Sequence, residues 1–215
     1  NNIDIVKFLI SNKANINDKD NSGMTPLMWA VIHSNIDIVK FLISNKANIN
    51  DKDNTGDTPL MEAVFHSNID MAKLLISNKA NINDKDNSGM TPLMWAVIHS
   101  NIDIVKFLIS NKANINDKDN TGDTPLMEAV FHSNIDMAKL LISNKANIND
   151  KDNSGRTPLM NAVIHSNIDI VKLLISNKAN INDKDNDGWT PLMEAVIDNN
   201  IDIVKFLISN KANIN

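Results

Sequence analysis

The chain repeats itself every 33 residues along its whole length, and this period constrains its fold more than any other feature. A period of this length is typical of proteins in which one small structural unit is stacked many times. The 215 residues are therefore expected to form a single repeat array, not one or two ordinary globular domains. The glycines and prolines mark the period, at Gly23, Gly56, Gly89, Gly122, Gly155 and Gly188, and at Pro26, Pro59, Pro92, Pro125, Pro158 and Pro191.

The boundaries of the repeats follow from the aspartate that lies three residues before each glycine. Residues 1–19 form the second half of a repeat, and residues 185–215 form a nearly complete last repeat. The full repeats between them are 20–52, 53–85, 86–118, 119–151 and 152–184. Residues 20–85 recur without a change as residues 86–151, so the sameness of these repeats records duplication and says nothing about selection.

Each repeat carries the signals of two short helices followed by a loop. Thr25 and Pro26 supply a capping hydroxyl and a proline at the first helical position. This helix is expected to end near Ser34, where Asn35 can cap a second helix that runs to Ser44. Residues 45–52 are rich in Asn, Asp and Lys and favour an extended loop. Helices this short are marginal alone in water, so the repeats must stack on one another.

These patterns resemble the ankyrin repeat along the entire chain. Residues 23–30 read GMTPLMWA, close to the family signature T-P-L-H-x-A, and residues 38–43 and 47–50 read IVKFLI and ANIN. The resemblance implies an all-α solenoid of stacked helix-turn-helix units with projecting hairpin-like loops. Met28 stands where the family has His. Ser34 and Lys46 stand where glycine is usual, so we expect left-handed backbone on these residues or on the adjacent asparagine.

Composition excludes several classes of function. A net charge of -5 gives no positive field for phosphate backbones or anionic lipid, so neither a nucleic-acid nor a membrane partner is expected. The apolar runs are far shorter than the roughly 20 residues that cross a bilayer. The chain has no cysteine, which removes disulfides and thiolate metal sites, and its first residues lack a signal-peptide pattern. These features predict an intracellular, cytoplasmic location.

Two patterns resemble metal sites, and we interpret both as structural. Asp183, Asp185, Asp187 and Glu194 fit the spacing of a calcium loop, but the helix expected at Pro191 would begin inside that loop, so turn and cap chemistry explains them. The second pattern is one histidine at the same position of each full repeat. No cysteine or regular carboxylate accompanies these histidines to complete a metal site, so we predict no metal ligands. Instead we expect a row of imidazoles on a binding face, and a pH-dependent interaction stays open as a secondary hypothesis. The histidines take one position per repeat, at His33, His66, His99, His132 and His165.

Enzyme signatures are absent from the sequence. Each glycine is isolated by a full period, so no phosphate-binding loop or dinucleotide fingerprint can form locally. The glutamates of the first helices have near-identical surroundings, which gives no reason for an acid and base pair. We therefore expect no catalysis and no cofactor.

Variation between repeats points to a surface for a partner. The residue after each glycine and the residue after each T-P-L-M motif change from repeat to repeat between large apolar and acidic types. In proteins that the chain resembles, such positions line a concave face formed by the loops and first helices. An alternative is that the tryptophans only cover the core. The expected contacts are Met24, Trp29, His33, Asp57, Glu62, His66, Met90, Trp95, His99, Asp123, Glu128, His132, Arg156 and Trp189, with Asp57, Glu62, Asp123 and Glu128 giving selectivity.

The resemblance thus implies a non-catalytic scaffold that binds another protein on its concave face. A structural alternative is an array, or a fragment of a longer array, that associates end to end, because apolar residues such as Leu9 and Ile208 lie in its first and last helices without a polar cap. A third interpretation is an engineered repeat scaffold with no native partner, which would explain the unchanged copy of residues 20–85.

Overall fold

The computed structural model describes residues 2–214, and these residues form thirteen α-helices and no strand. The all-α fold class predicted from the sequence is confirmed. The chain divides into two compact units, residues 1–113 and 114–215, which are described separately. Whether they form the single array expected from the period stays a prediction.

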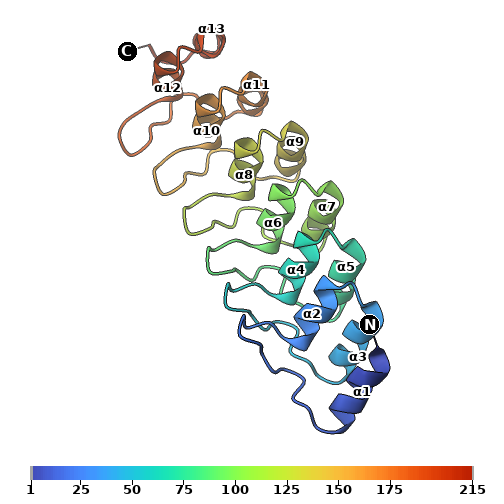
Figure 1. The fold of residues 1–215 in the computed structure, drawn as a ribbon. Helices are drawn as coiled ribbons and strands as arrows, with labels where there is room; N and C mark the ends of the chain where they lie inside the picture. Colours follow the sequence, from blue (N-terminus) through green and yellow to red (C-terminus); the bar gives the residue numbers. More distant parts are fainter. Residues whose placement is uncertain (1, 215) are drawn as a thin grey trace. The chain divides into compact units, whose positions relative to one another are not determined.

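Within each unit, a seven-residue first helix is followed by a nine-residue second helix, and the loops between successive pairs project to one side (Figure 1). The first unit begins with a second helix, and each first helix packs on the next, α2 on α4 and α4 on α6. Its helices are α1 (Ile3–Ser11), α2 (Pro26–Ile32), α3 (Ile36–Ser44), α4 (Pro59–Phe65), α5 (Ile69–Ser77), α6 (Pro92–Ile98) and α7 (Ile102–Ser110).

The second unit repeats this arrangement. First helices pack on first helices, α8 on α10 and α10 on α12, while second helices pack on second helices, α9 on α11 and α11 on α13. Its helices are α8 (Pro125–Phe131), α9 (Ile135–Ser143), α10 (Pro158–Ile164), α11 (Ile168–Ser176), α12 (Pro191–Ile197) and α13 (Ile201–Ser209).

The first helices begin where the sequence predicted, at a capping threonine followed by proline. The Thr58 hydroxyl accepts a hydrogen bond from the Met61 N–H at 3.3 Å, and the Met61 sulfur accepts one from the Thr58 N–H at 3.4 Å. Methionine thus completes a reciprocal cap at the position where the sequence comparison expected histidine. The same pair of contacts joins Thr25 to Met28 in α2.

Both helices of a repeat end in left-handed backbone. Ser34 has φ 54° and Lys46 has φ 69°, and each other repeat shows the same two positions. Of the two alternatives left open by the sequence, the structure therefore has the left-handed conformation on serine and lysine themselves. In the last repeat Asn199 takes the serine position, with φ 52°.

The core lies between the two layers of helices and between neighbouring repeats. In α4 and α5 the buried side chains are Pro59 and a set that is 2% exposed or less, namely Leu60, Met61, Ala63, Val64, Met71, Ala72 and Leu75. These side chains come from one stripe on each helix, as the 3.6-residue period requires. Since a single pair of short helices buries only one side of each stripe, the remaining burial comes from the adjacent repeats.

Asparagine side chains connect the loops of successive repeats. The Asn81 N–H donates to the Asn50 carboxamide oxygen at 2.8 Å, and the Asn54 amide group donates to the Asn21 carbonyl at 2.9 Å. In the second unit the Asn147 N–H donates to Asn116 in the same way, also at 2.8 Å. Such bonds recur between successive repeats within each unit, which gives the regular asparagines a structural role.

Of the helices that the structure describes, none is long and apolar enough to cross a lipid bilayer.

Candidate partner-binding surface

The loop turns of the first unit hold the tryptophans in place. The Asp20 carboxylate accepts backbone N–H groups of Ser22 and Met24 at 2.8 and 3.0 Å, which closes the turn. Its other oxygen accepts the Trp29 indole N–H at 2.9 Å. These bonds, first that from Met24, lower the pKa of Asp20 against the opposing effect of desolvation. The Trp29 ring is therefore fixed between its helix and its loop.

The tryptophans lie on the surface and not in the core. Trp29 is 45% exposed, and Trp95 and Trp189 are each partly exposed. Trp95 repeats the loop contact of Trp29, because its indole N–H donates to the Asp86 carboxylate at 3.1 Å. Trp29 is thus exposed, whereas Trp95 and Trp189 are only partly exposed, and the role of the tryptophans as contacts stays a prediction.

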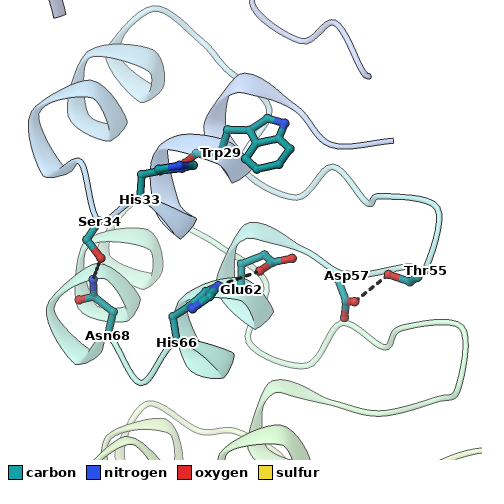
Figure 2. Close-up of polar contacts among 8 residues, drawn as sticks. All are labelled: Trp29, His33, Ser34, Thr55, Asp57, Glu62, His66 and Asn68. Atoms are coloured by element: carbon teal, nitrogen blue, oxygen red, sulfur yellow. Dashed lines mark hydrogen bonds and ion pairs between the residues drawn. The ribbon is translucent and has the colours of Figure 1, made fainter. Parts of the chain in front are cut away.

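Acidic residues occupy the same surface in the repeat between Trp29 and Trp95. Glu62 extends from α4, and its carboxylate lies 3.8 Å from the His66 imidazole (Figure 2). The Thr55 hydroxyl oxygen lies 2.7 Å from a carboxylate oxygen of Asp53 and 2.7 Å from one of Asp57. One hydroxyl hydrogen cannot serve both carboxylates, but Asp53 also accepts the backbone N–H groups of Thr55 and Asp57, each at 2.8 Å, so the hydroxyl can donate to Asp57.

Burial and mutual repulsion change how these acids titrate. Desolvation, followed by the charges of Asp57 and Asp53, raises the pKa of Glu62 to about 7. Desolvation also raises the pKa of Asp57, against the lowering effect of the Thr55 hydroxyl. The identical copy behaves alike, since burial raises the pKa of Glu128 to about 7. Glu62 and its copy Glu128 thus share one shift with one main cause, desolvation.

An aromatic cluster lies beside these acids. Phe65 meets the Trp95 ring edge-on, with centroids 6.0 Å apart, and meets the His99 ring at 4.8 Å. Trp95 and His99 are stacked at 5.8 Å with an interplanar angle of 12°. Phe65 nevertheless remains 51% exposed. Such geometry orders large apolar side chains without removing them from solvent.

The five histidines cap the C-termini of first helices, at exposed positions. His66 faces Glu62 and His132 faces Glu128, each pair at 3.8 Å. His33 instead places its Nδ1 2.9 Å from the Trp29 carbonyl oxygen. Among the described residues no group of three His, Cys, Asp or Glu could hold a metal ion. The Asp185 carboxylate, part of the calcium-like pattern, accepts backbone N–H groups of its own turn.

The second unit presents the copied acids in a changed setting. Asp123 and Glu128 repeat the positions of Asp57 and Glu62, and the Thr121 hydroxyl again lies 2.7 Å from Asp123. Arg156 is exposed and lines a cavity with Asp123 and Glu128. Trp189 lies in the last repeat, and its backbone N–H donates to the Asp185 carboxylate at 2.8 Å.

Two expected contacts lie below the surface, and three side chains outside the expected set of contacts line it. Met24 and Met90 are each only 8% exposed and offer a partner almost no area. Asp53, Thr55 and Phe65 line a cavity with Asp57, Glu62, Met61 and Trp95. The sequence offered a signal for Phe65, because its position is apolar in every repeat and lies one helical turn after Glu62 on the same side of the first helix.

Comparison with known proteins covers the whole chain. A family model of three ankyrin repeats matches residues 1–86, 81–152 and 146–215. A search of curated proteins gives no match.

Proposed function

Because the chain belongs to the ankyrin repeat family, whose members are generally modules of protein–protein interaction and typically non-catalytic, we propose that it binds another protein through its loops and first helices. The proposed contact surface is defined by the exposed or partly exposed side chains of these elements. In the first unit it comprises Trp29, His33, Asp57, Glu62, Phe65, His66, Trp95 and His99, and in the second unit Asp123, Glu128, His132, Arg156 and Trp189.

The exposure of ordered aromatic side chains is the observation that carries this proposal. Trp29 and Phe65 are 45% and 51% exposed although burying them would be favourable. Each is held by neighbours, so little conformational entropy is lost when a partner covers it. Large aromatic anchors next to charged groups are what protein interfaces use for affinity and selectivity.

A capture experiment with matched variants tests the proposal. The full chain, immobilised, is compared with a Trp29→Ala/Trp95→Ala variant and with a Lys40→Ala/Lys106→Ala variant, which changes two exposed side chains of second helices. All three are first checked for equal helical circular dichroism and melting. We expect a protein from the source organism's lysate to be held by the wild type and the lysine variant and lost by the tryptophan variant.

Two results would count against this proposal. One is that no protein is enriched by the wild type over a blank support. The other is that the lysine and tryptophan variants lose the captured protein to the same extent, which would show that the surface of the first helices has no special role.

Self-association is the second candidate. Apolar side chains of the last repeat are exposed, including Val196 at 56% and Ile197 at 58%, and they line a cavity of about 530 Å³ with Trp189. Apolar patches of this kind are typical of protein contacts. Light scattering over a wide range of concentrations decides the matter, because a molar mass that stays at 23.8 kDa eliminates self-assembly.

A further inference from the structure

The duplication provides two cavities with the same floor and different walls. The first, of about 260 Å³, is here called the acidic-aromatic pocket and is lined by Asp53, Thr55, Asp57, Met61, Glu62, Phe65 and Trp95. The second, of about 340 Å³, has on its floor the copied residues Asp119, Thr121, Asp123, Met127, Glu128 and Phe131. The facing turn and helix, residues 86–99 for the first and 152–165 for the second, differ only at Met90, replaced by Arg156, and at Trp95, replaced by Asn161.

The acidic-aromatic pocket combines crowded carboxylates with aromatic walls. The side chain of Glu62 is only 16% exposed, and Asp57 is partly buried. Asp53 accepts the backbone N–H groups of Thr55 and Asp57, and the Thr55 hydroxyl lies within hydrogen-bond distance of both Asp53 and Asp57. No lysine or arginine is among the described residues that line this pocket, and the His66 imidazole lies 3.8 Å from the Glu62 carboxylate. The pocket thus gathers three carboxylates beside aromatic walls with no lysine or arginine in its lining.

The second cavity contains a cation that belongs to the chain itself. Arg156 lines it together with the copied acids Asp123 and Glu128 and with Asp152. Where the first cavity has the Trp95 ring, the second has the amide of Asn161. The same acidic floor therefore has no lysine or arginine in its lining in one repeat and has the exposed Arg156 in its lining in the other.

We propose that the acidic-aromatic pocket binds the cationic end of a lysine or arginine side chain carried by the partner protein. The inference rests on the proposed function and names the chemistry of the partner at this place. Carboxylates at the base of the pocket attract the ammonium or guanidinium group, and the Phe65 and Trp95 rings contact its aliphatic stem or its charge. Removal from water strengthens both attractions.

Titration with capped amino acids tests the pocket directly. The probes are the N-acetyl methylamides of lysine, arginine and norleucine, the last of which keeps the apolar stem and lacks the charge. The Trp95 indole N–H, bonded to Asp86 at the rim, reports binding in an amide-correlation NMR spectrum and is assigned with Trp95→Phe. We expect a saturable shift with lysine or arginine and none with norleucine, and the relative affinities of the two cations identify the preferred one.

Matched variants separate the pocket from general electrostatic attraction. Glu62→Gln is expected to weaken binding about tenfold, the effect of one charge-assisted contact, whereas Glu128→Gln removes the same charge from the copied floor and should leave the Trp95 signal unchanged. Arg156→Met with Asn161→Trp gives the second cavity the wall of the first. This variant should gain a second binding event, reported by the indole that Asn161→Trp introduces.

Three results would overturn the inference. These are a norleucine shift equal to the cationic ones, no saturable shift from either cation, or equal affinities for wild type and Glu62→Gln when both show the same melt. A captured partner that Glu62→Gln holds as tightly as the wild type would also overturn it while leaving the proposed function in place. Failure to capture any partner counts against the proposed function, whereas binding of the amides decides the chemistry of the pocket separately.

Discussion

Two residues in each repeat adopt a backbone conformation that suits glycine better. Lys79 has φ 71° and Ser67 has φ 54°. For an L-residue this region places Cβ close to its own backbone and costs about 1 to 2 kcal/mol. Glycine itself stands at a third left-handed position, Gly56, where φ is 88° and an added Cβ would lie 2.6 Å from the Asn87 nitrogen. At Gly56 both the available space and φ favour glycine, whereas at Lys79 and Ser67 only φ is unfavourable.

Lys79→Gly should therefore stabilise the protein. Relief of the strained backbone outweighs the extra flexibility that glycine gives to the unfolded chain, and we expect the free energy of unfolding to rise by about 0.5 to 1 kcal/mol. Urea denaturation followed by circular dichroism measures it. Gly56→Ala is the opposite control and should destabilise the fold; a loss of stability in Lys79→Gly would contradict the strain argument.

Glu62 makes the fold less stable as its carboxyl group ionises. Its pKa is raised from 4.5 to about 7, so the folded state binds more protons than the unfolded state between these values. The stabilisation that comes from this difference in proton binding is complete below pH 4.5 and is lost as pH rises through about 7. Glu62→Gln removes this loss. Because part of the Glu62 side chain contacts solvent, the effect of its charge is reduced. We expect Glu62→Gln to raise the free energy of unfolding by about 1 kcal/mol at pH 8.

The comparison at pH 5 serves as the control for this variant. There Glu62 is largely protonated in the folded protein, and glutamine has a similar shape and neutral charge. The unfolding curves of wild type and Glu62→Gln should therefore nearly coincide at pH 5 and separate at pH 8. A constant difference at both values would point to packing and not to charge.

At the scale of the elements, the loops gain their order from one another. A loop rich in polar residues buries little apolar surface, and its conformation depends on hydrogen bonds between repeats. Asn50 shows the arrangement, because its own N–H donates to the Asn48 side chain at 3.2 Å while its carboxamide oxygen accepts from the Asn81 N–H at 2.8 Å. The loop of one repeat is thereby shaped and joined to the next by asparagine amides.

Asn50→Ala should loosen this connection. It removes the acceptor of the Asn81 N–H, and because that group is exposed and water can replace the bond, we expect a cost of only about 0.5 to 1 kcal/mol. Hydrogen exchange of the Asn81 amide should accelerate more than exchange in the helix α5. Asn50→Asp keeps an oxygen at this place and is the control; equal exchange rates in the two variants would show that the bond does not order the loop.

At the scale of the whole molecule, one sequence occurs in two settings. Residues 53–65 and 119–131 are identical, yet Phe65 contacts the Trp95 ring at 6.0 Å whereas Phe131 has Asn161 at the corresponding place. Each phenylalanine also meets a histidine of the following repeat, at 4.8 and 5.0 Å. Any difference between the two copies therefore arises from the neighbouring repeat.

Phe65→Leu should accordingly cost more stability than Phe131→Leu. The first substitution loses two aromatic contacts to the following repeat and the second loses one, and a pair of rings contributes about 0.5 to 1.5 kcal/mol beyond its buried area. Urea denaturation of the two variants measures the difference. Trp95→Leu is then added to both variants as a control. In this background Phe65→Leu should no longer cost more free energy of unfolding than Phe131→Leu.

The sequence by itself determined the period, the helix pairs and their starting points. These features depend on interactions within a few residues, such as the cap between Thr58 and Met61 and the proline that follows Thr58, so each repeat carries its own signal. The same locality explains why the left-handed positions could be placed at Ser34 and Lys46 or their neighbours from a comparison with glycine. Repetition strengthened every one of these inferences.

The tertiary structure alone decided how the surface is composed. Met24 and Trp29 are both large apolar residues beside a loop, and only the packing of the turn shows that Met24 is buried while Trp29 is exposed. The acidic-aromatic pocket also joins Asp53 to Trp95, which lie in different repeats. Burial and charge crowding depend on distances across repeats, which local sequence patterns do not encode, and it is these distances that raise the pKa of Glu62 and open its pocket to a cation.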